Sequence, residues 1–203
     1  MITRLWVDNY KCLVNFELPL SELTLLLGPN GVGKSAVLDV VFALRQLLSG
    51  VAKITDAEIF PTRTLTRWQS RPVQIIELEI DLDAVRMTYR LEVERKPGTR
   101  LAQVGLERLA LPSGPLFEFH GGEVQLYSDD HKKGLDFRSD SSESALARFA
   151  SSSSSRHLAQ FLSFMRKILV CSLYPPSFVP ESASEDVLLD WPNLATTGMA
   201  GET

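Results

Sequence analysis

The sequence predicts a mixed α/β fold in which a strand, a glycine-rich loop and a helix are followed by an antiparallel β-meander. The apolar run Leu23–Leu27 has the length of a strand and leads directly into the loop 28–35. Apolar residues between Ala36 and Leu48 have the spacing of an amphipathic helix, and Gly50 stands where a helix C-cap is expected. Over 73–94, apolar residues alternate with charged or polar ones, as in strands that bury one face.

The loop has the residue types of a phosphate-binding loop. Its members are Gly28, Pro29, Asn30, Gly31, Val32, Gly33, Lys34 and Ser35. The glycines allow close backbone approaches that a Cβ would block, so the loop N–H groups can converge on one anion at the positive end of the helix. Lys34 would bring a full charge to the β- and γ-phosphates, and the Ser35 hydroxyl would ligate Mg²⁺. A chance glycine turn ending in Lys-Ser is the alternative. The flanking strand and helix favour a phosphate loop, with ATP and Mg²⁺ as ligands.

Composition and charge narrow the class of protein. The chain has 203 residues, of which 44% are hydrophobic, so it can form a substantial core. The net charge of −4 argues against a nucleic-acid binder as a whole, although it leaves room for a local basic patch. Cys12 and Cys171 lie in apolar surroundings, which predicts buried free thiols in a reducing, cytoplasmic setting. No apolar run approaches the roughly 18 residues of a membrane span, so no membrane partner is expected.

Two predicted strands precede the loop. They cover Ile2–Val7 and Val14–Leu18, and Asn9-Tyr10-Lys11 forms the turn between them. This order, followed by LLLGPNGVGKS and a long helix, resembles the N-terminal lobe of ABC-type ATPases of the SMC and OLD-like AAA group. Within that group the chain is most similar to the bacterial proteins described as predicted ATPases.

The resemblance implies a P-loop NTPase fold, in the form of an ABC-ATPase-like N-terminal lobe whose antiparallel β-subdomain meets the nucleotide. It also implies that two heads sandwich ATP, so a homodimer is expected, and that hydrolysis drives a further partner, often DNA or an attached nuclease. A glutamine should lie beside the nucleotide. Gln69 and Gln74 are both candidates, and Gln74, at the start of the first meander strand, is favoured.

The segment 51–72 is less regular. Asp56–Phe60 is either a short helix or a loop that ends at Pro61. The stretch that follows contains Arg63, Arg67, Trp68 and Arg71, which could contact phosphates or a partner. The favoured interpretation is a solvated loop with Trp68 packed into the core.

Residues 73–128 are predicted to form the antiparallel β-subdomain, within a single domain of residues 1–203. With Asp83-Ala84 as a two-residue loop, apolar and opposite-charge pairs fall in register together. Asp-Ala is not a favoured loop, and a turn one residue longer is the alternative. The expected pairs are Ile80–Met87, Leu78–Tyr89, Ile76–Leu91, Asp81–Arg86 and Glu77–Arg90. A further strand is expected at 101–109. A hairpin around Gly121-Gly122 should then pair Phe119 with Val124 and Phe117 with Leu126.

The remainder, 129–203, is predicted as a helix, a strand and a polar tail. Asp129–Ser144 is polar and expected to be mobile. Ser155 is a plausible N-cap for a helix that buries Leu158, Phe161, Leu162, Met165, Ile168 and Leu169. Val170–Tyr174 has the character of a strand, and the tail Val179–Thr203 is mostly polar. His120, His131 and His157 have no metal-ligand spacing.

ATP hydrolysis needs a carboxylate pair after an apolar strand, and the sequence has no such pair after the first helix. Val187-Leu188-Leu189-Asp190 is the nearest approach, and an ABC signature is also absent. Together with the resemblance, this predicts that the chain is the N-terminal nucleotide-binding half of an ABC/SMC-like ATPase, with the C-terminal half missing. The alternative is a truncated, non-catalytic module that binds a nucleotide or a partner.

Overall fold

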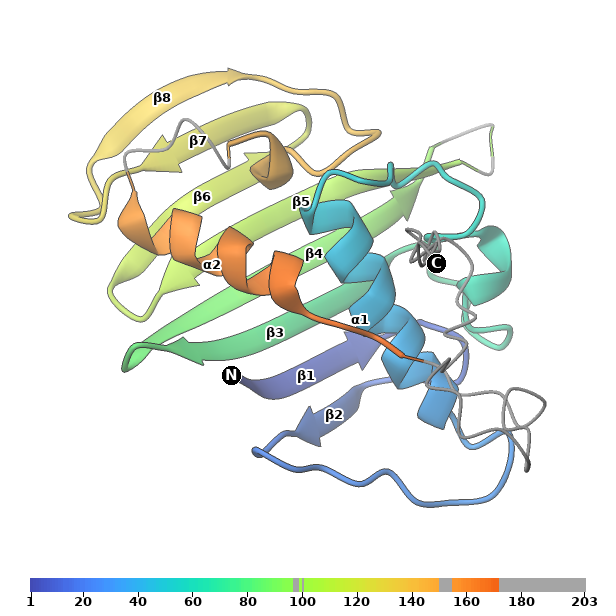
Figure 1. Cartoon of the computed structure of the whole chain (residues 1–203). Helices are drawn as coiled ribbons and strands as arrows, with labels where there is room; N and C mark the ends of the chain where they lie inside the picture. Colours follow the sequence, from blue (N-terminus) through green and yellow to red (C-terminus); the bar gives the residue numbers. More distant parts are fainter. Residues whose placement is uncertain (97–98, 100, 150–154, 172–203) are drawn as a thin grey trace, which may run out of the picture. The chain divides into compact units, whose positions relative to one another are not determined.

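Eight strands form a single antiparallel sheet in the order β2-β1-β3-β4-β5-β6-β7-β8. The computed structural model describes residues 1–96, 99, 101–149 and 155–171. Residues 1–168 belong to one compact unit. Figure 1 shows the two α-helices of this unit against the same face of the sheet, so the sheet buries one face and leaves the other to solvent.

The elements follow one another along the chain with these bounds: β1 (Ile2–Asp8), β2 (Phe16–Pro19), α1 (Lys34–Leu48), the 3₁₀ helix η1 (Thr62–Thr64), β3 (Gln74–Leu82), β4 (Val85–Arg95), β5 (Ala102–Leu111), β6 (Gly114–His120), β7 (Glu123–Tyr127), β8 (Lys133–Arg138), the 3₁₀ helix η2 (Leu146–Phe149) and α2 (Arg156–Lys167).

The hairpin registers confirm the sequence prediction. β3 and β4 pair Ile80 with Met87, Leu78 with Tyr89, Ile76 with Leu91, Asp81 with Arg86 and Glu77 with Arg90. The turn is the two-residue loop, because Asp83 and Ala84 both adopt left-handed φ angles, of 49° and 65°. Across the Gly121-Gly122 turn, β6 and β7 also have the expected pairs. The pairing of apolar with apolar and of acidic with basic residues across β3 and β4 therefore fixes the register, even though Asp-Ala is an unfavourable turn sequence.

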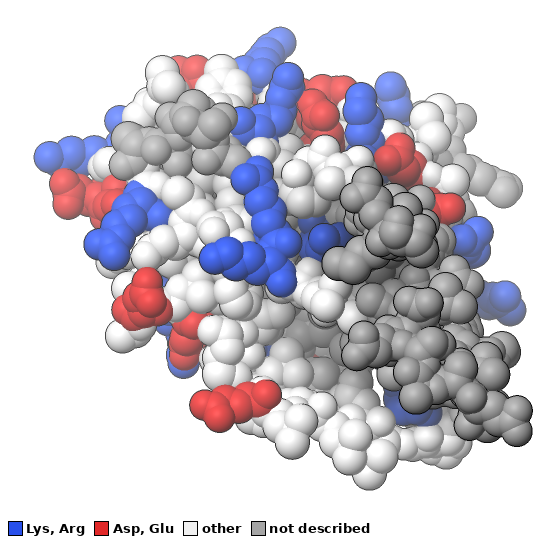
Figure 2. Space-filling model, in the orientation of Figure 1, with Lys and Arg blue, Asp and Glu red and all other residues white. Residues whose placement is uncertain are grey.

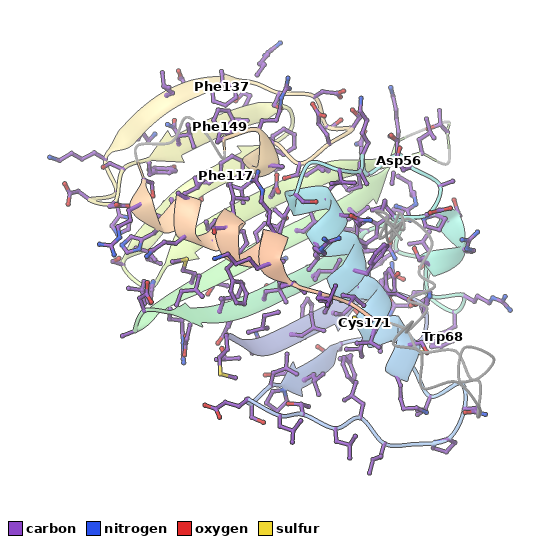
Figure 3. All side chains as sticks on the ribbon, viewed as in Figure 1. Asp56, Trp68, Phe117, Phe137, Phe149 and Cys171 are labelled. Carbon is purple, nitrogen blue, oxygen red and sulfur yellow. The ribbon has the colours of Figure 1, made fainter. Side chains whose placement is uncertain are left out.

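The meander is part of a larger sheet than 73–128. β1 pairs with β3, so the first two strands extend the sheet on one side, and β8 extends it on the other. Part of the polar segment Asp129–Ser144 forms β8, a strand that the sequence did not predict. The strand is an exposed edge, which explains its polar sequence. Phe137 anchors it against Phe149 of η2, with ring centroids 4.8 Å apart (Figure 3).

The expected strand at Leu23–Leu27 is not part of the sheet. These residues run as an extended segment with no strand assignment. Leu23, Leu25 and Leu27 are 88%, 75% and 79% exposed, and only Leu26 packs against the core. The alternation of a strand is present, but a strand also needs hydrogen-bonding neighbours, and none of the described residues supplies them.

The segment 51–72 is a loop with one short 3₁₀ helix. Asp56–Phe60 forms turns, which selects the loop over the helix. The burial of Trp68 was wrong. This side chain is 70% exposed (Figure 3), and Ile59 and Phe60 fill the core instead. Arg71 forms an ion pair with Asp8, with 2.7 Å between its Nη2 and Oδ2 of the carboxylate, so this arginine holds the loop against the end of β1.

Both helices have the predicted caps, and α2 buries Leu158, Phe161, Leu162 and Met165 as expected, but it ends at Lys167, and the predicted burial of Leu169 was wrong because that side chain is 64% exposed. α1 ends at Leu48, and Gly50 follows with a φ of 73°, which a helix C-terminus favours in glycine. α2 is capped by Ser155, whose Oγ accepts a hydrogen bond from the N–H of Leu158 at 3.2 Å. Phe161 packs on Tyr89 with ring centroids 5.3 Å apart, which fixes α2 on the sheet.

The strand predicted at Val170–Tyr174 and the predicted burial of the two cysteines differ from the structure where it describes these residues. Val170 and Cys171 carry no strand assignment, and residues 172–174 and the tail Val179–Thr203 lie outside the described residues. Cys12 and Cys171 are free, but both are exposed, so their predicted burial was wrong. No helix formed by the described residues has the length and apolarity to span a membrane.

The surface of α2 is basic. It carries exposed Arg156, Arg166 and Lys167 and no acidic residue. Figure 2 shows lysine and arginine side chains gathered on the face where α2 lies. A local basic patch is therefore compatible with the net negative charge of the chain.

A bulge in β5 buries a glutamate that the sequence did not single out. The β4–β5 register shifts at Glu92 and Val93, so inward-facing positions change from Ala102 and Val104 to Glu107 and Leu109. Tyr89 and Ser144 donate to Oε1 of Glu107 at 2.9 Å and 2.6 Å, and the Leu146 N–H donates to Oε2 at 3.2 Å. Burial raises the pKa of Glu107, and these donors offset part of the effect.

The raised pKa predicts a pH-dependent contribution to stability. Because the fold favours the protonated carboxyl, the contribution is full in acid. It is lost as the pH rises from the ordinary glutamate value of about 4.3 through the folded pKa. Glu107→Gln stays neutral. The free energy of unfolding of Glu107→Gln, relative to that of the parent, should therefore rise with pH by up to about 1.4 kcal/mol per pH unit. Urea unfolding between acid and neutral pH measures this.

Glu123→Gln is the matched control for that experiment, because it makes the same substitution at an exposed position of the sheet. If the Glu107→Gln difference instead falls with increasing pH, the three donors outweigh burial and the folded carboxylate is the favoured form.

Candidate functional site

The glycine-rich loop and the first turn of α1 form one wall of a pocket of about 370 Å³. Of the predicted loop residues, Asn30, Gly31, Gly33, Lys34 and Ser35 line it. No side chain caps α1, whose N-cap residue is Gly33. The N–H groups of the first helical turn therefore lack a side-chain partner and are available to an anion at the positive end of the helix.

Lys34 is folded back over its own loop. Its Nζ donates hydrogen bonds to the carbonyl oxygens of Gly28 and Pro29 at 2.6 Å and 2.7 Å. Val32, at the tip of the loop, is 56% exposed and does not line the pocket. The ammonium is thus held on its own loop by two neutral acceptors, which an anion with full charge can replace.

The backbone at Gly33 requires a glycine. Its φ is 110°, and a Cβ built there would lie 2.8 Å from Sγ of Cys12. The turn between β1 and β2 therefore packs directly against the start of α1. At Gly31, by contrast, the φ is 84° and nothing lies within 4 Å of an added Cβ, so the loop backbone is open on the pocket side and fits a phosphate group.

The turn after β1 supplies a second wall of the pocket. Lys11 and Cys12 line it together with Asp39 of α1, and Lys11 forms an ion pair with Asp39. Tyr10 lies buried beside them, and burial, with Asp39 nearby, raises the pKa of its hydroxyl. The sequence identified the turn at 9–11 but gave it no part in the site. The available signal was Asp39, which stands four residues after Ser35 and therefore on the same face of the helix.

The structure places Gln74 away from this pocket. It is fully buried at the start of β3, where its Nε2 donates to the carbonyl oxygens of Asn9 and Thr64 at 3.1 Å and 3.0 Å. Its Oε1 accepts from Arg95 at 2.9 Å. Gln69 is half-buried, and its Oε1 accepts from a side chain of the same loop at 3.1 Å. Neither glutamine lines the pocket with Lys34 and Ser35.

The position of Cys12 gives a direct test of the pocket. Because its thiol is exposed and lines the same cavity as Lys34, tripolyphosphate bound there should slow its alkylation. If the thiol reacts only in the free protein, the rate should fall about tenfold when the tripolyphosphate concentration is roughly nine times its Kd. The measurement is the rate of reaction with iodoacetamide in a Cys171→Ser background, with and without tripolyphosphate. A rate that does not change would place anions elsewhere, and Lys34→Ala should abolish the protection.

Two comparisons with known proteins bear on this site. A family model described as an AAA ATPase domain matches residues 1–156, which is more than half of the 203-residue chain. The OLD nuclease of Thermus scotoductus is 46% identical over 41 residues, or 20% of this chain and 8% of that protein. The matched region is thus a small part of that relative's length. The resemblance of the N-terminal part to an OLD-like AAA ATPase is confirmed, and the protein belongs to the AAA ATPase domain family.

Proposed function

We propose that the protein binds ATP with Mg²⁺ through the loop 28–35 and is the N-terminal nucleotide-binding half of an ABC/SMC-like ATPase. The observation that carries the proposal is the geometry of Lys34. Its ammonium sits over the loop carbonyls, in a pocket at the uncapped N-terminus of α1. Members of the AAA ATPase domain family generally bind ATP with Mg²⁺, and this chain has the groups to do so.

Each residue has a defined part in this binding. The N–H groups of the loop and of the first turn of α1 donate to the phosphate oxygens. Lys34 exchanges the carbonyl oxygens of Gly28 and Pro29 for the β- and γ-phosphates, where it neutralises more charge. The exposed Ser35 supplies a hydroxyl ligand for Mg²⁺, which offsets phosphate charge when bound.

The assignment to an N-terminal half has support from the extended segment Leu23–Leu27. Its three exposed leucines alternate as in a strand that has neighbours, and further strands beside it would bury them. We propose that these strands belong to the C-terminal half of the same ATPase. A nuclease or DNA partner is part of the proposal, because the related protein is an OLD nuclease. A homodimer is also part of it, because the ATPases that the sequence resembles hold ATP between two heads.

Lys34→Ala should reduce ATP affinity by at least about tenfold and leave the fold intact, since the ammonium bonds to solvent-exposed loop carbonyls. Titration of a fluorescent ATP analogue measures the affinity, and circular dichroism with thermal unfolding checks the fold. Ser35→Ala is the companion variant, and it should lose most of the Mg²⁺-dependent gain in affinity. Equal affinities of the parent and Lys34→Ala would refute the assignment.

A second candidate is a module that binds the nucleotide without hydrolysing it. It is favoured by the sequence, in which no apolar strand after α1 ends in a carboxylate pair. Both candidates predict that this chain alone does not turn over ATP, because positioning of the attacking water and charge stabilisation make up most of phosphoryl-transfer catalysis.

Phosphate release from the purified chain should therefore stay at the level of the Lys34→Ala control over a wide range of protein concentrations. A Lys34-dependent rate on the order of 1 s⁻¹, ordinary for an enzyme, would show that the chain carries its own catalytic carboxylate. Asp190 and Glu185 would then be the first residues to replace.

A further inference from the structure

The phosphate pocket contains a second lysine. Lys11, in the turn after β1, lines the same cavity as Lys34 and Ser35, and its Nζ pairs with Oδ2 of Asp39 on α1. Both side chains are partly open to solvent, at 39% for Lys11 and 25% for Asp39. An exposed pair of this kind contributes little to stability by itself, which leaves its position in the pocket to be explained.

The backbone holds Lys11 in a fixed place. Its φ is 53°, an uncommon value for a residue with a side chain. Its N–H donates to the Thr64 carbonyl at 2.5 Å, and its neighbour Tyr10 exchanges backbone hydrogen bonds with Leu13 at 3.0 Å and 2.8 Å. The Lys11 ammonium also lies 5.7 Å from the centroid of the Tyr10 ring. The side chain therefore starts from a rigid turn and ends at the pocket wall.

We propose that Lys11 is a second phosphate-binding residue of this site and that Asp39 is the residue that positions it. A lysine ammonium has three N–H donors, and Asp39 occupies one, so two remain for phosphate oxygens. The inference rests on the proposed nucleotide binding and extends it. The triphosphate is held between a lysine of the loop and a lysine of the β1–β2 turn.

Charge supports this arrangement over a purely structural pair. A triphosphate carries several negative charges, and the single ammonium of Lys34 neutralises only part of them. Asp39 would repel an anion in the same pocket if its carboxylate were unpaired. Lys11 cancels that repulsion and presents its remaining donors to the anion, so one side chain removes an unfavourable interaction and adds a favourable one.

The test compares tripolyphosphate and ATP affinities of four proteins by isothermal titration calorimetry. Lys11→Met should weaken both ligands by about tenfold or more, and Lys11→Arg, which keeps the charge and donors, should restore most of the affinity. The decisive variant is the double substitution Lys11→Met with Asp39→Asn. It has the same net charge as the parent, and it should still bind about tenfold more weakly because the donors are gone.

Each other result overturns the inference. If the double variant binds like the parent, the pair only balances its own charge. If Lys11→Met weakens ATP but leaves tripolyphosphate unchanged, Lys11 contacts the nucleoside. Thermal unfolding without ligand must show all variants folded, and the double variant serves if Lys11→Met alone does not fold. Lys34→Ala is measured in parallel and should lose affinity whether or not Lys11 contributes. If it does, an unchanged affinity of the Lys11 variants refutes only the role of Lys11, and the proposed nucleotide binding stands.

Discussion

The hydrogen bonds of two buried amides hold the candidate site together. Asn9 donates from Nδ2 to the carbonyl oxygens of Arg71 and Val73 at 2.7 Å and 2.8 Å, and its Oδ1 accepts from the Thr66 N–H at 3.1 Å. Gln74 donates in turn to the carbonyl oxygens of Asn9 and of the 3₁₀ helix η1. These amides replace water for backbone groups that the turn and the loop bury, so removing either would leave several polar groups without partners.

The consequence of this network is that the turn after β1 has one conformation against α1. The sheet fixes β1, the amides fix the turn, and the contact between Cys12 and Gly33 fixes the turn against the loop. A site assembled from segments so far apart in the chain therefore needs little rearrangement before it meets a ligand. Preorganised donors of this kind lose less conformational entropy on binding.

The parts of the fold that local pattern decides could be predicted from the sequence. In the β3–β4 hairpin, apolar and charged residues agree on one register. At Gly33 and Lys34, the residue types and the helix that follows agree on a glycine-rich loop at the N-terminus of α1. The failures arise where a residue's environment comes from distant segments. Trp68 is apolar yet exposed, because Ile59 and Phe60 already fill the core. Leu23–Leu27 has the pattern of a strand, but pattern alone does not supply neighbouring strands.

In the candidate site, too, some residues could be identified from local sequence and others could not. Its loop residues are contiguous in the sequence, whereas Lys11, Cys12 and Asp39 join it only through the packing of the β1–β2 turn on α1. Glu107 is buried because one extra residue in β5 reverses the faces of the strand, and a search for alternating residues cannot locate such a bulge in advance.

The exposed leucines before the loop have a practical meaning for work with the chain by itself. An extended apolar segment without strand neighbours is a template for pairing with other chains, so concentrated solutions should self-associate through residues 23–27, and a charge placed at Leu25 should improve solubility.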